Sequence, residues 1–436
     1  METTLIFFIF FLMLFITLKK TAISLAILLN INIFRAIPYV DYHQPFYGYY
    51  NENDILLGAI LPTLCFIIML LKIFWQKNKI KYHLDVLDVF MALLAFMMIL
   101  SIVFSPNKSN SIYYTGIFLI LACPFYFTTK IFFMNSNNKK KDFLLFASSI
   151  VFFAMIFSFI SLYLHSIAKY PYERMTFPGV FPIPFCLFLC LALMILIVYQ
   201  IKPSFKVKFT KKTKLLFSVP ILCLIAFSAI KTNTRGPVFA MILSFIVTLF
   251  MFFRIKLNIK IIMGFIFSFF MGFVIFITAF DVNKIASRFI NLAPKNAESF
   301  TPRILAYIDS INILFTRPWG ISVGTFEEFY SNKSIAKSGA YAHNIFMELI
   351  SSFGIIGLLF SFLIIYLCLY EYNFIIKNQK KIFSDNLFFI SILLSVFFFF
   401  ETQFSFTLNT HKGWYLTMAL YSVFKFNFLK EKYEEV

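Results

Sequence analysis

The sequence predicts an all-α, polytopic integral membrane protein with about 12 to 13 transmembrane helices. Sixty per cent of the 436 residues are hydrophobic and 14% are charged, which leaves too little polar surface for a water-soluble protein of this length. The hydrophobic residues fall into runs of about 15 to 22, the length that crosses a bilayer core as a helix. Lysines gather in alternate gaps between these runs, as they do in multi-span proteins.

Thirteen apolar runs are candidate spans. The first two are short and are separated only by Lys19 and Lys20, so one tilted helix or a re-entrant pair would reduce the count to twelve. Met1-Glu2 lacks the basic region of a cleavable signal peptide, so we expect the first run to be retained. The runs lie at 4–18, 21–36, 55–72, 87–104, 112–133, 143–164, 182–200, 214–231, 237–253, 261–280, 343–366, 386–401 and 413–427.

The distribution of charge predicts which side of the membrane each connection occupies. The net charge is +19, but 25 of the 39 basic residues gather in alternate connections, which indicates a cytoplasmic side and excludes a nucleic-acid-binding surface as the reason for the charge. We expect these lysines, Lys72 to Lys81 and Lys130 to Lys141 among them, to face lipid headgroups.

The opposite side is rich in arginine and carries one long loop. Six of the seven arginines lie there, and their planar guanidinium groups suit bidentate contacts with an anion. The loop at 281–342 is too long for a simple connection, so we expect it to be functional. Within it, five apolar residues recur at helical spacing and predict an amphipathic helix at the outer interface. These residues are Ile304, Leu305, Ile308, Ile311 and Leu314.

Several chemistries are not indicated. The sequence has no glycine-rich phosphate loop, no Asp-x-Asp pair for a metal-held nucleotide sugar and no zinc-binding spacing, which argues against a nucleotide-dependent cytoplasmic enzyme. The six cysteines lie inside apolar runs and are most simply buried small hydrophobes. Asp85 and Asp88 are interpreted as polar residues at a helix start. Few ionisable residues interrupt the spans, which argues against an ion-driven carrier.

Four residues are candidates for an outer-face site. Arg235 lies in Thr234-Arg235-Gly236-Pro237, a helix N-terminus that favours an anion. His343 precedes another outer helix start, where the helix dipole favours the neutral imidazole that accepts a proton. Arg303 enters the amphipathic helix, and Arg174 precedes a proline-rich turn. A simpler interpretation stays open for each: the arginines as ion pairs or headgroup contacts, and His343 as a helix cap.

These motifs, in this order, resemble the O-antigen ligase and O-antigen polymerase family. The pattern comprises TRG at an outer helix start, an arginine entering a helix in a large outer loop, a proline-glycine turn, and a His-Asn pair before a Gly-x-x-Gly helix. The strong similarity covers about residues 232 to 360. Trp319 and the wider first glycine spacing depart from the family pattern. The matching positions are Pro318, Gly320, Gly324, Phe326, His343, Asn344, Gly354 and Gly357.

The resemblance implies a GT-C-like membrane fold and an inverting, metal-independent glycosyltransferase of the bacterial inner membrane. Such an enzyme moves a glycan from undecaprenyl diphosphate to a sugar hydroxyl at the periplasmic face in lipopolysaccharide or surface polysaccharide biosynthesis. His343, Arg235 and Arg303 would be catalytic, and Arg235, Arg303 and Arg174 would bind the diphosphate. The expected organisation is an N-terminal bundle at 1–231, a core at 232–366 that includes the loop, and C-terminal helices at 367–436.

Alternatives stay open for the acceptor of the glycan and for the class of protein. An O-antigen ligase, whose acceptor is lipid A core, is slightly favoured over a polymerase, whose acceptor is a lipid-linked repeat unit. A flippase for the lipid-linked glycan would also need a basic, diphosphate-holding cavity, but few charges lie within the spans. A non-enzymatic scaffold is the remaining alternative.

Overall fold

The computed structural model describes residues 2–37, 56–77, 79–167, 174–201, 211–252, 301–330, 341–404, 407–408 and 411–434. Within these ranges every regular element is a helix, which confirms the predicted all-α class.

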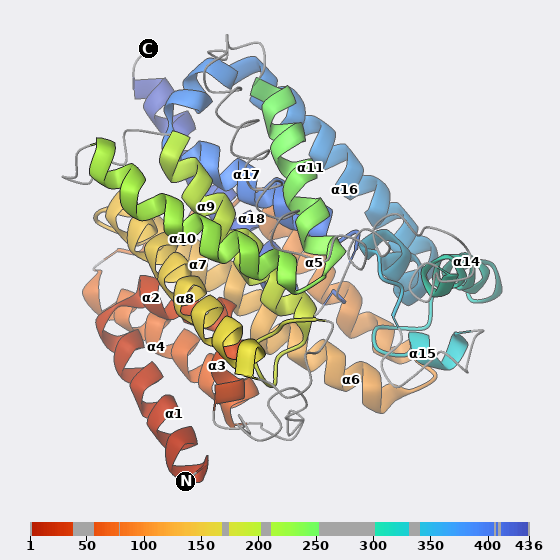
Figure 1. The fold of residues 1–436 in the computed structure, drawn as a ribbon. Coiled ribbons are helices and arrows are strands. Elements are labelled where there is room, and N and C mark those ends of the chain that lie inside the picture. The colour runs from red at the N-terminus through yellow and green to blue at the C-terminus, as the bar shows by residue number, and fades with distance from the viewer. Residues whose placement is uncertain are drawn as a thin grey trace. The chain divides into compact units, whose positions relative to one another are not determined.

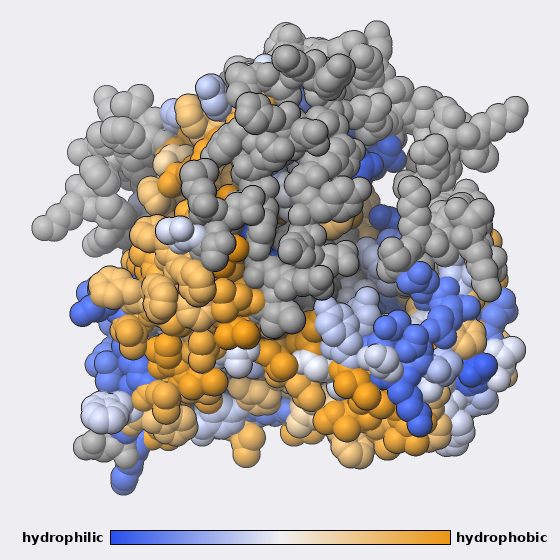
Figure 2. Space-filling model, turned by 90° about the horizontal axis from the view of Figure 1, so that it is seen from below, coloured by the Kyte–Doolittle hydropathy of each residue, from blue (hydrophilic) through white to orange (hydrophobic). Residues whose placement is uncertain are grey.

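Seven described helices are long and apolar enough to cross a membrane, which confirms a polytopic membrane protein. They are Leu56–Gln76, Val86–Phe104, Lys108–Asn135, Lys139–Ser166, Pro182–Gln200, Arg235–Phe252 and Ile345–Ser384. Three shorter apolar helices cover Thr4–Lys19, Ser218–Lys231 and Asn386–Glu401. The predicted span at 261–280 lies outside the described residues. Figure 2 shows broad areas of hydrophobic residues on the face in view, as a lipid-exposed surface requires.

The first two apolar runs form a hairpin, which excludes the alternative of one tilted helix. Helix α1 (Glu2–Lys19) ends before Lys20, whose backbone is not helical, and α2 (Thr21–Leu29) follows. The hydroxyls of Thr17 and Ser24 lie 2.7 Å apart, whereas seven residues of a straight helix rise about 10 Å. The second run also breaks at Asn30, before α3 (Ile31–Ala36). Both α2 and α3 are therefore shorter than a span.

The chain forms two compact units that are not consecutive in sequence. Unit 1 comprises Met1–Phe96, Thr115–Phe245 and Ser384–Val436, and unit 2 comprises Met97–Tyr114 and Ile246–Phe383. In unit 1, α18 packs against α7 and α17, α9 against α10, α2 against α8, and α1 against α4 (Figure 1). These helices are α4 (Leu61–Gln76), α7 (Cys123–Asn135), α8 (Lys139–Ile167), α9 (Pro182–Ile201), α10 (Lys211–Lys231), α17 (Asn386–Glu401) and α18 (Lys412–Glu434).

A buried ion pair joins two helices of unit 1, and it corrects the prediction for Lys130. The Lys130 side chain is 1% exposed, and its Nζ lies 2.6 Å from Asp88 Oδ2 and 3.2 Å from Asp85 Oδ2. The hydroxyls of Tyr82 and Tyr126 donate to Asp88 Oδ1. Lys130 therefore does not face lipid headgroups. Asp85 does stand at a helix start, because its Oδ1 accepts from the backbone N–H groups that open α5 (Val86–Ser101).

Unit 2 contains the end of α5, most of α6 (Lys108–Ile117) and nearly all of α16 (Ile345–Ser384). It also contains α14 (Thr301–Thr316) and α15 (Phe326–Phe329). Helix α16 is interrupted at Gly354, where φ is 59° and ψ is −131°. It runs about 18 residues past the predicted span end at 366, so Lys377 to Lys381 lie on the helix and not in a loop.

Candidate functional site

Asn344, and not His343, caps helix α16. The Asn344 Oδ1 accepts hydrogen bonds from the backbone N–H of Phe346 at 2.9 Å and of Met347 at 3.3 Å, the positions that an N-cap side chain satisfies. The simpler interpretation of His343 as the helix cap is therefore wrong. The imidazole is left available for another role.

The His343 side chain is held in an unusual and largely apolar setting. Its backbone has φ 55°, a left-handed value that is uncommon outside glycine. The ring of Tyr341 lies 4.0 Å from the imidazole, centroid to centroid. Among the described residues, the buried Nδ1 atom of His343 has no hydrogen-bond partner. Burial and, secondarily, the charge of Arg303 lower the pKa of His343 to about 4, so the imidazole is neutral at pH 7.

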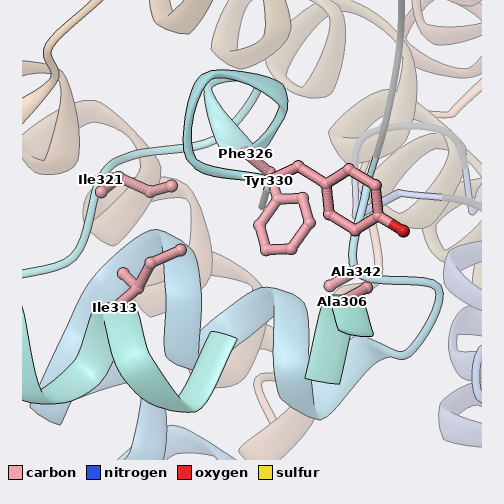
Figure 3. Close-up of a cluster of buried hydrophobic side chains, with 6 residues drawn as sticks. All are labelled: Ala306, Ile313, Ile321, Phe326, Tyr330 and Ala342. Atoms are coloured by element: carbon pink, nitrogen blue, oxygen red, sulfur yellow. The ribbon is translucent and has the colours of Figure 1, made fainter. Parts of the chain in front are cut away.

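Helix α14 brings Arg303 to His343 through a small apolar cluster. Ala306 lies one turn after Arg303, and it is 1% exposed, as is Ala342 beside His343. Both belong to one cluster (Figure 3), in which the small side chains let α14 approach the segment before α16 closely. The cluster comprises Ala306, Ile313, Ile321, Phe326, Tyr330 and Ala342. Arg303 lies one turn before Ala306, close enough for its charge to act on His343.

The buried face of α14 also carries a carboxylate. Asp309 is 7% exposed and lies two turns from Arg303. Burial and, after it, the charge of Asp309 raise the pKa of Tyr330. Tyr330 itself is 4% exposed and lines the same cluster. The face of α14 that packs in unit 2 is therefore mixed, with Arg303 at its start and Asp309 in its middle.

The glycines of the sequence motif let two backbones touch at the break in α16. Backbone N–H groups of Ile321 and Ser322 donate to the carbonyls of Ser351 and Ser352 at 3.0 and 2.9 Å, and that of Ile355 donates to Pro318 at 2.8 Å. A Cβ at Gly354 would lie 1.8 Å from the Pro318 oxygen. The turn after α14 and the start of α16 are thus fixed against each other.

A Cβ at Gly320 or Gly357 would collide in the same way. At Gly320 it would lie 2.3 Å from the Ser352 oxygen, and at Gly357 it would lie 1.9 Å from the Leu349 oxygen. These positions therefore require glycine for packing. Their role is to hold the segment that carries His343.

Residues at the end of α5 and in α6 also contact this turn. Ser101 and Ser322 share a hydrogen bond of 2.8 Å between their hydroxyls, and Ser111 donates to the Val323 carbonyl at 3.1 Å. The Tyr114 ring lies over Gly324, where a Cβ would meet it at 2.2 Å. Sequence reasoning missed this contribution, because residues so distant in the chain carry no shared pattern.

Arg235 and Arg174 lie together at one end of unit 1. Arg235 is the first residue of α11 (Arg235–Phe252) and is exposed. Arg174 is also exposed, and the backbone N–H of the next residue, Met175, donates to the Lys231 carbonyl at 3.0 Å, four residues before Arg235. The four predicted site residues therefore form two pairs, Arg174 with Arg235 in unit 1 and Arg303 with His343 in unit 2.

Another histidine, His411, lies in unit 1 and has a partner that the sequence did not suggest. His411 is 3% exposed, and its Nδ1 lies 3.5 Å from Oε2 of the fully buried Glu401. Glu401, which ends an apolar run, was the available signal. Among the described residues, no group of three or more His, Cys, Asp or Glu is placed to hold a metal.

The geometry supports two chemical operations. A neutral imidazole with an unengaged nitrogen can accept a proton, and exposed guanidinium groups at a helix start can bind an anion. Residues 219–362 match the model of the family described as O-antigen ligase. The match includes Arg235, Arg303 and His343, and Arg174 lies outside it. The comparisons with curated proteins and with solved structures found no match.

Proposed function

Because residues 219–362 carry a domain of the O-antigen ligase family, we propose that this multi-pass membrane protein transfers a glycan from undecaprenyl diphosphate to a sugar hydroxyl at the periplasmic face of the inner membrane. A glycan-transferring function in surface polysaccharide biosynthesis follows from the family. The donor, the acceptor, the membrane and the side are our proposal. We favour the ligase reaction, with lipid A core as acceptor.

The state of His343 is the observation that carries the proposed mechanism. Burial and the charge of Arg303 lower its pKa to about 4. Asn344, and not His343, caps α16. The acceptor oxygen attacks the anomeric carbon from the face opposite the diphosphate, and the configuration inverts. A base with so low a pKa takes the proton as the new C–O bond forms, when the hydroxyl becomes acidic.

The arginines serve the other half of the reaction. The bond between the anomeric carbon and the diphosphate oxygen breaks, and undecaprenyl diphosphate leaves with the electron pair. Guanidinium groups stabilise the charge that grows on that oxygen. We assign this role to Arg235 and Arg303, with Arg174 as a further contact to the diphosphate. No step requires a metal ion or a nucleotide.

The test is transfer by the purified protein in liposomes that contain lipid-linked glycan and lipid A core. We expect His343→Gln and Arg303→Gln each to lower the rate by about 10²-fold or more. Arg317→Gln is the matched control, because Arg317 lies just past the other end of α14 and packs on the ring of Phe329. Full activity of either site variant would refute the role assigned to that residue.

The same assay separates the alternatives within and outside the class. Glycan joined to lipid A core supports the ligase, and longer glycan chains on the lipid carrier support the polymerase. Movement of the lipid-linked glycan between leaflets, with no new glycosidic bond under any acceptor, would replace the proposal with a flippase.

A further inference from the structure

Helix α14 carries a second apolar stripe that the described residues of unit 2 leave exposed. Four apolar side chains at positions i, i+4, i+7 and i+11 are each more than 40% exposed. This spacing places them on one face of the helix. They are Ile304 at 42%, Ile308 at 47%, Ile311 at 44% and Phe315 at 78% exposed. The stripe therefore runs along nearly the whole of α14.

The orientation of α14 in unit 2 is fixed by its other face. Ala306 and Ile313 are buried in the cluster of Figure 3, and Ser310 between them is fully buried. The exposed stripe thus belongs to a helix that is already packed. Its apolar side chains do not belong to the core of unit 2, because the other face of α14 already packs there.

The stripe continues beyond the helix as an aromatic surface. Trp319, in the turn after α14, is 59% exposed and stacks on Phe104, with 6.0 Å between ring centroids and 18° between planes. Phe104 is itself 46% exposed. Exposed apolar side chains therefore occur along α14, in the turn that follows it and at Phe104, the last residue of the helix Val86–Phe104.

The opposite end of the stripe begins beside the proposed reaction site. Arg303 immediately precedes Ile304, and its charge acts on His343. The start of α14 thus offers a cation for a diphosphate, and the stripe offers apolar side chains over about 16 Å along the helix axis, the two groups that a prenyl diphosphate needs.

We propose that this stripe, from Ile304 through Trp319, binds the polyprenyl chain of the lipid-linked donor. This inference rests on the proposed function. A chain held there lets the diphosphate be presented to Arg303 at high effective concentration, since the two ends of one molecule bind neighbouring sites. Bulk phospholipid is the competing occupant.

The experiment compares donors that differ only in the length of their prenyl chain. We expect Ile308→Asn and Ile311→Asn to raise the KM for the undecaprenyl-linked donor by about three- to tenfold. The KM for a ten-carbon prenyl donor, which is too short to follow the stripe, should stay unchanged. Ile112→Asn is the matched control, because Ile112 is 57% exposed on α6, and it should change neither KM.

The outcomes are distinguishable. Equal loss with both donors would mean that the stripe only anchors the helix in lipid, and would overturn the proposal. Photo-crosslinking of radiolabelled undecaprenyl diphosphate to a benzoylphenylalanine at position 308, and not at position 112, tests the stripe without any transfer reaction. A positive crosslink in a protein that transfers no glycan would retain the lipid site and refute the proposed function, and its absence would overturn the stripe.

Discussion

The environment of His343 sets a measurable protonation equilibrium. An unperturbed histidine titrates near pH 6.5, whereas burial and the charge of Arg303 lower the pKa of His343 to about 4. The neutral form is therefore complete above the ordinary pKa and is lost only as the pH falls through about 4. We expect ¹⁵N NMR of histidine-labelled protein in micelles to show one imidazole with that midpoint, and the acidic limb of activity to follow it.

Two variants test whether the imidazole with the low pKa is that of His343. His343→Gln should remove the low-pKa resonance and leave those of the other histidines. Arg303→Gln should raise its midpoint, because one of the two causes of the shift is removed, while burial keeps the value below 6.5. A midpoint for His343 near 6.5 in the unaltered protein would contradict the geometry described for it.

The pair of Lys130 and Asp88 predicts a stability effect far from the proposed site. Lys130→Met would leave Asp88, which is 4% exposed, without its cation. Breaking a buried pair from one side costs about 3–5 kcal/mol, and the tyrosine hydroxyls that donate to Asp88 offset only part of this. Thermal unfolding in detergent should show a clear decrease in Tm. Lys79→Met, at an exposed position, is the control, and an equal Tm for both variants would disprove the effect.

Single residues show where sequence reasoning succeeds and where it stops. His343 and Arg303 were identified from their order and from a helix start, and in the structure the charge of Arg303 acts on the neutral imidazole of His343. His343 was left open as the helix cap, and the structure gives that role to Asn344, because one residue of register decides which polar side chain reaches the free N–H groups. Lys130 was misassigned because a lysine at the end of an apolar run has the same pattern whether it faces water or a buried aspartate.

At the scale of elements, the break in α16 predicts the effect of a single methyl group. Gly354 has φ 59°, and its Cβ would overlap the Pro318 carbonyl. Gly354→Ala should cost at least about 2–3 kcal/mol, measured as lowered Tm. Gly116→Ala is the control, because a Cβ there would meet nothing within 4 Å and alanine favours a helix. A normal Tm and rate for Gly354→Ala would show that the turn and α16 are not tightly docked.

The elements themselves were predictable to different degrees. Period and length identified α14 and the start of α16, because apolar residues at helical spacing depend on nothing beyond the local chain. The glycines of α16 were recognised only as a motif. The physical reason for Gly354 is a contact with the turn at Pro318, more than thirty residues away, and that for Gly357 is the Leu349 carbonyl across the break in α16. Two spans, a re-entrant pair and one tilted helix were all open for the first two apolar runs, and the hydroxyl contact between Thr17 and Ser24 excludes the single helix.

At the scale of the whole molecule, each compact unit is assembled from separate stretches of the chain. Unit 2 takes α14 and most of α16 from one part and a short stretch, Met97–Tyr114, from another, and the serine contacts at Ser101 and Ser111 tie that stretch to the turn. A hydropathy profile finds the spans but assigns none of them to a unit. The grouping of Arg174 with Arg235, and of Arg303 with His343, was therefore beyond the reach of the sequence.

Orientation in the membrane is the remaining whole-molecule prediction. From Ile355 to Ser384, α16 continues for about 45 Å, more than a hydrocarbon core of about 30 Å, so His343 and the lysines at 377–381 should lie on opposite sides. In a cysteine-free background, we expect an impermeant maleimide added to spheroplasts to label Glu327→Cys. Gln379→Cys should react only after the membrane is permeabilised. The reverse pattern would place His343 in the cytosol, where a periplasmic acceptor could not reach it, and the proposed reaction would fail with it.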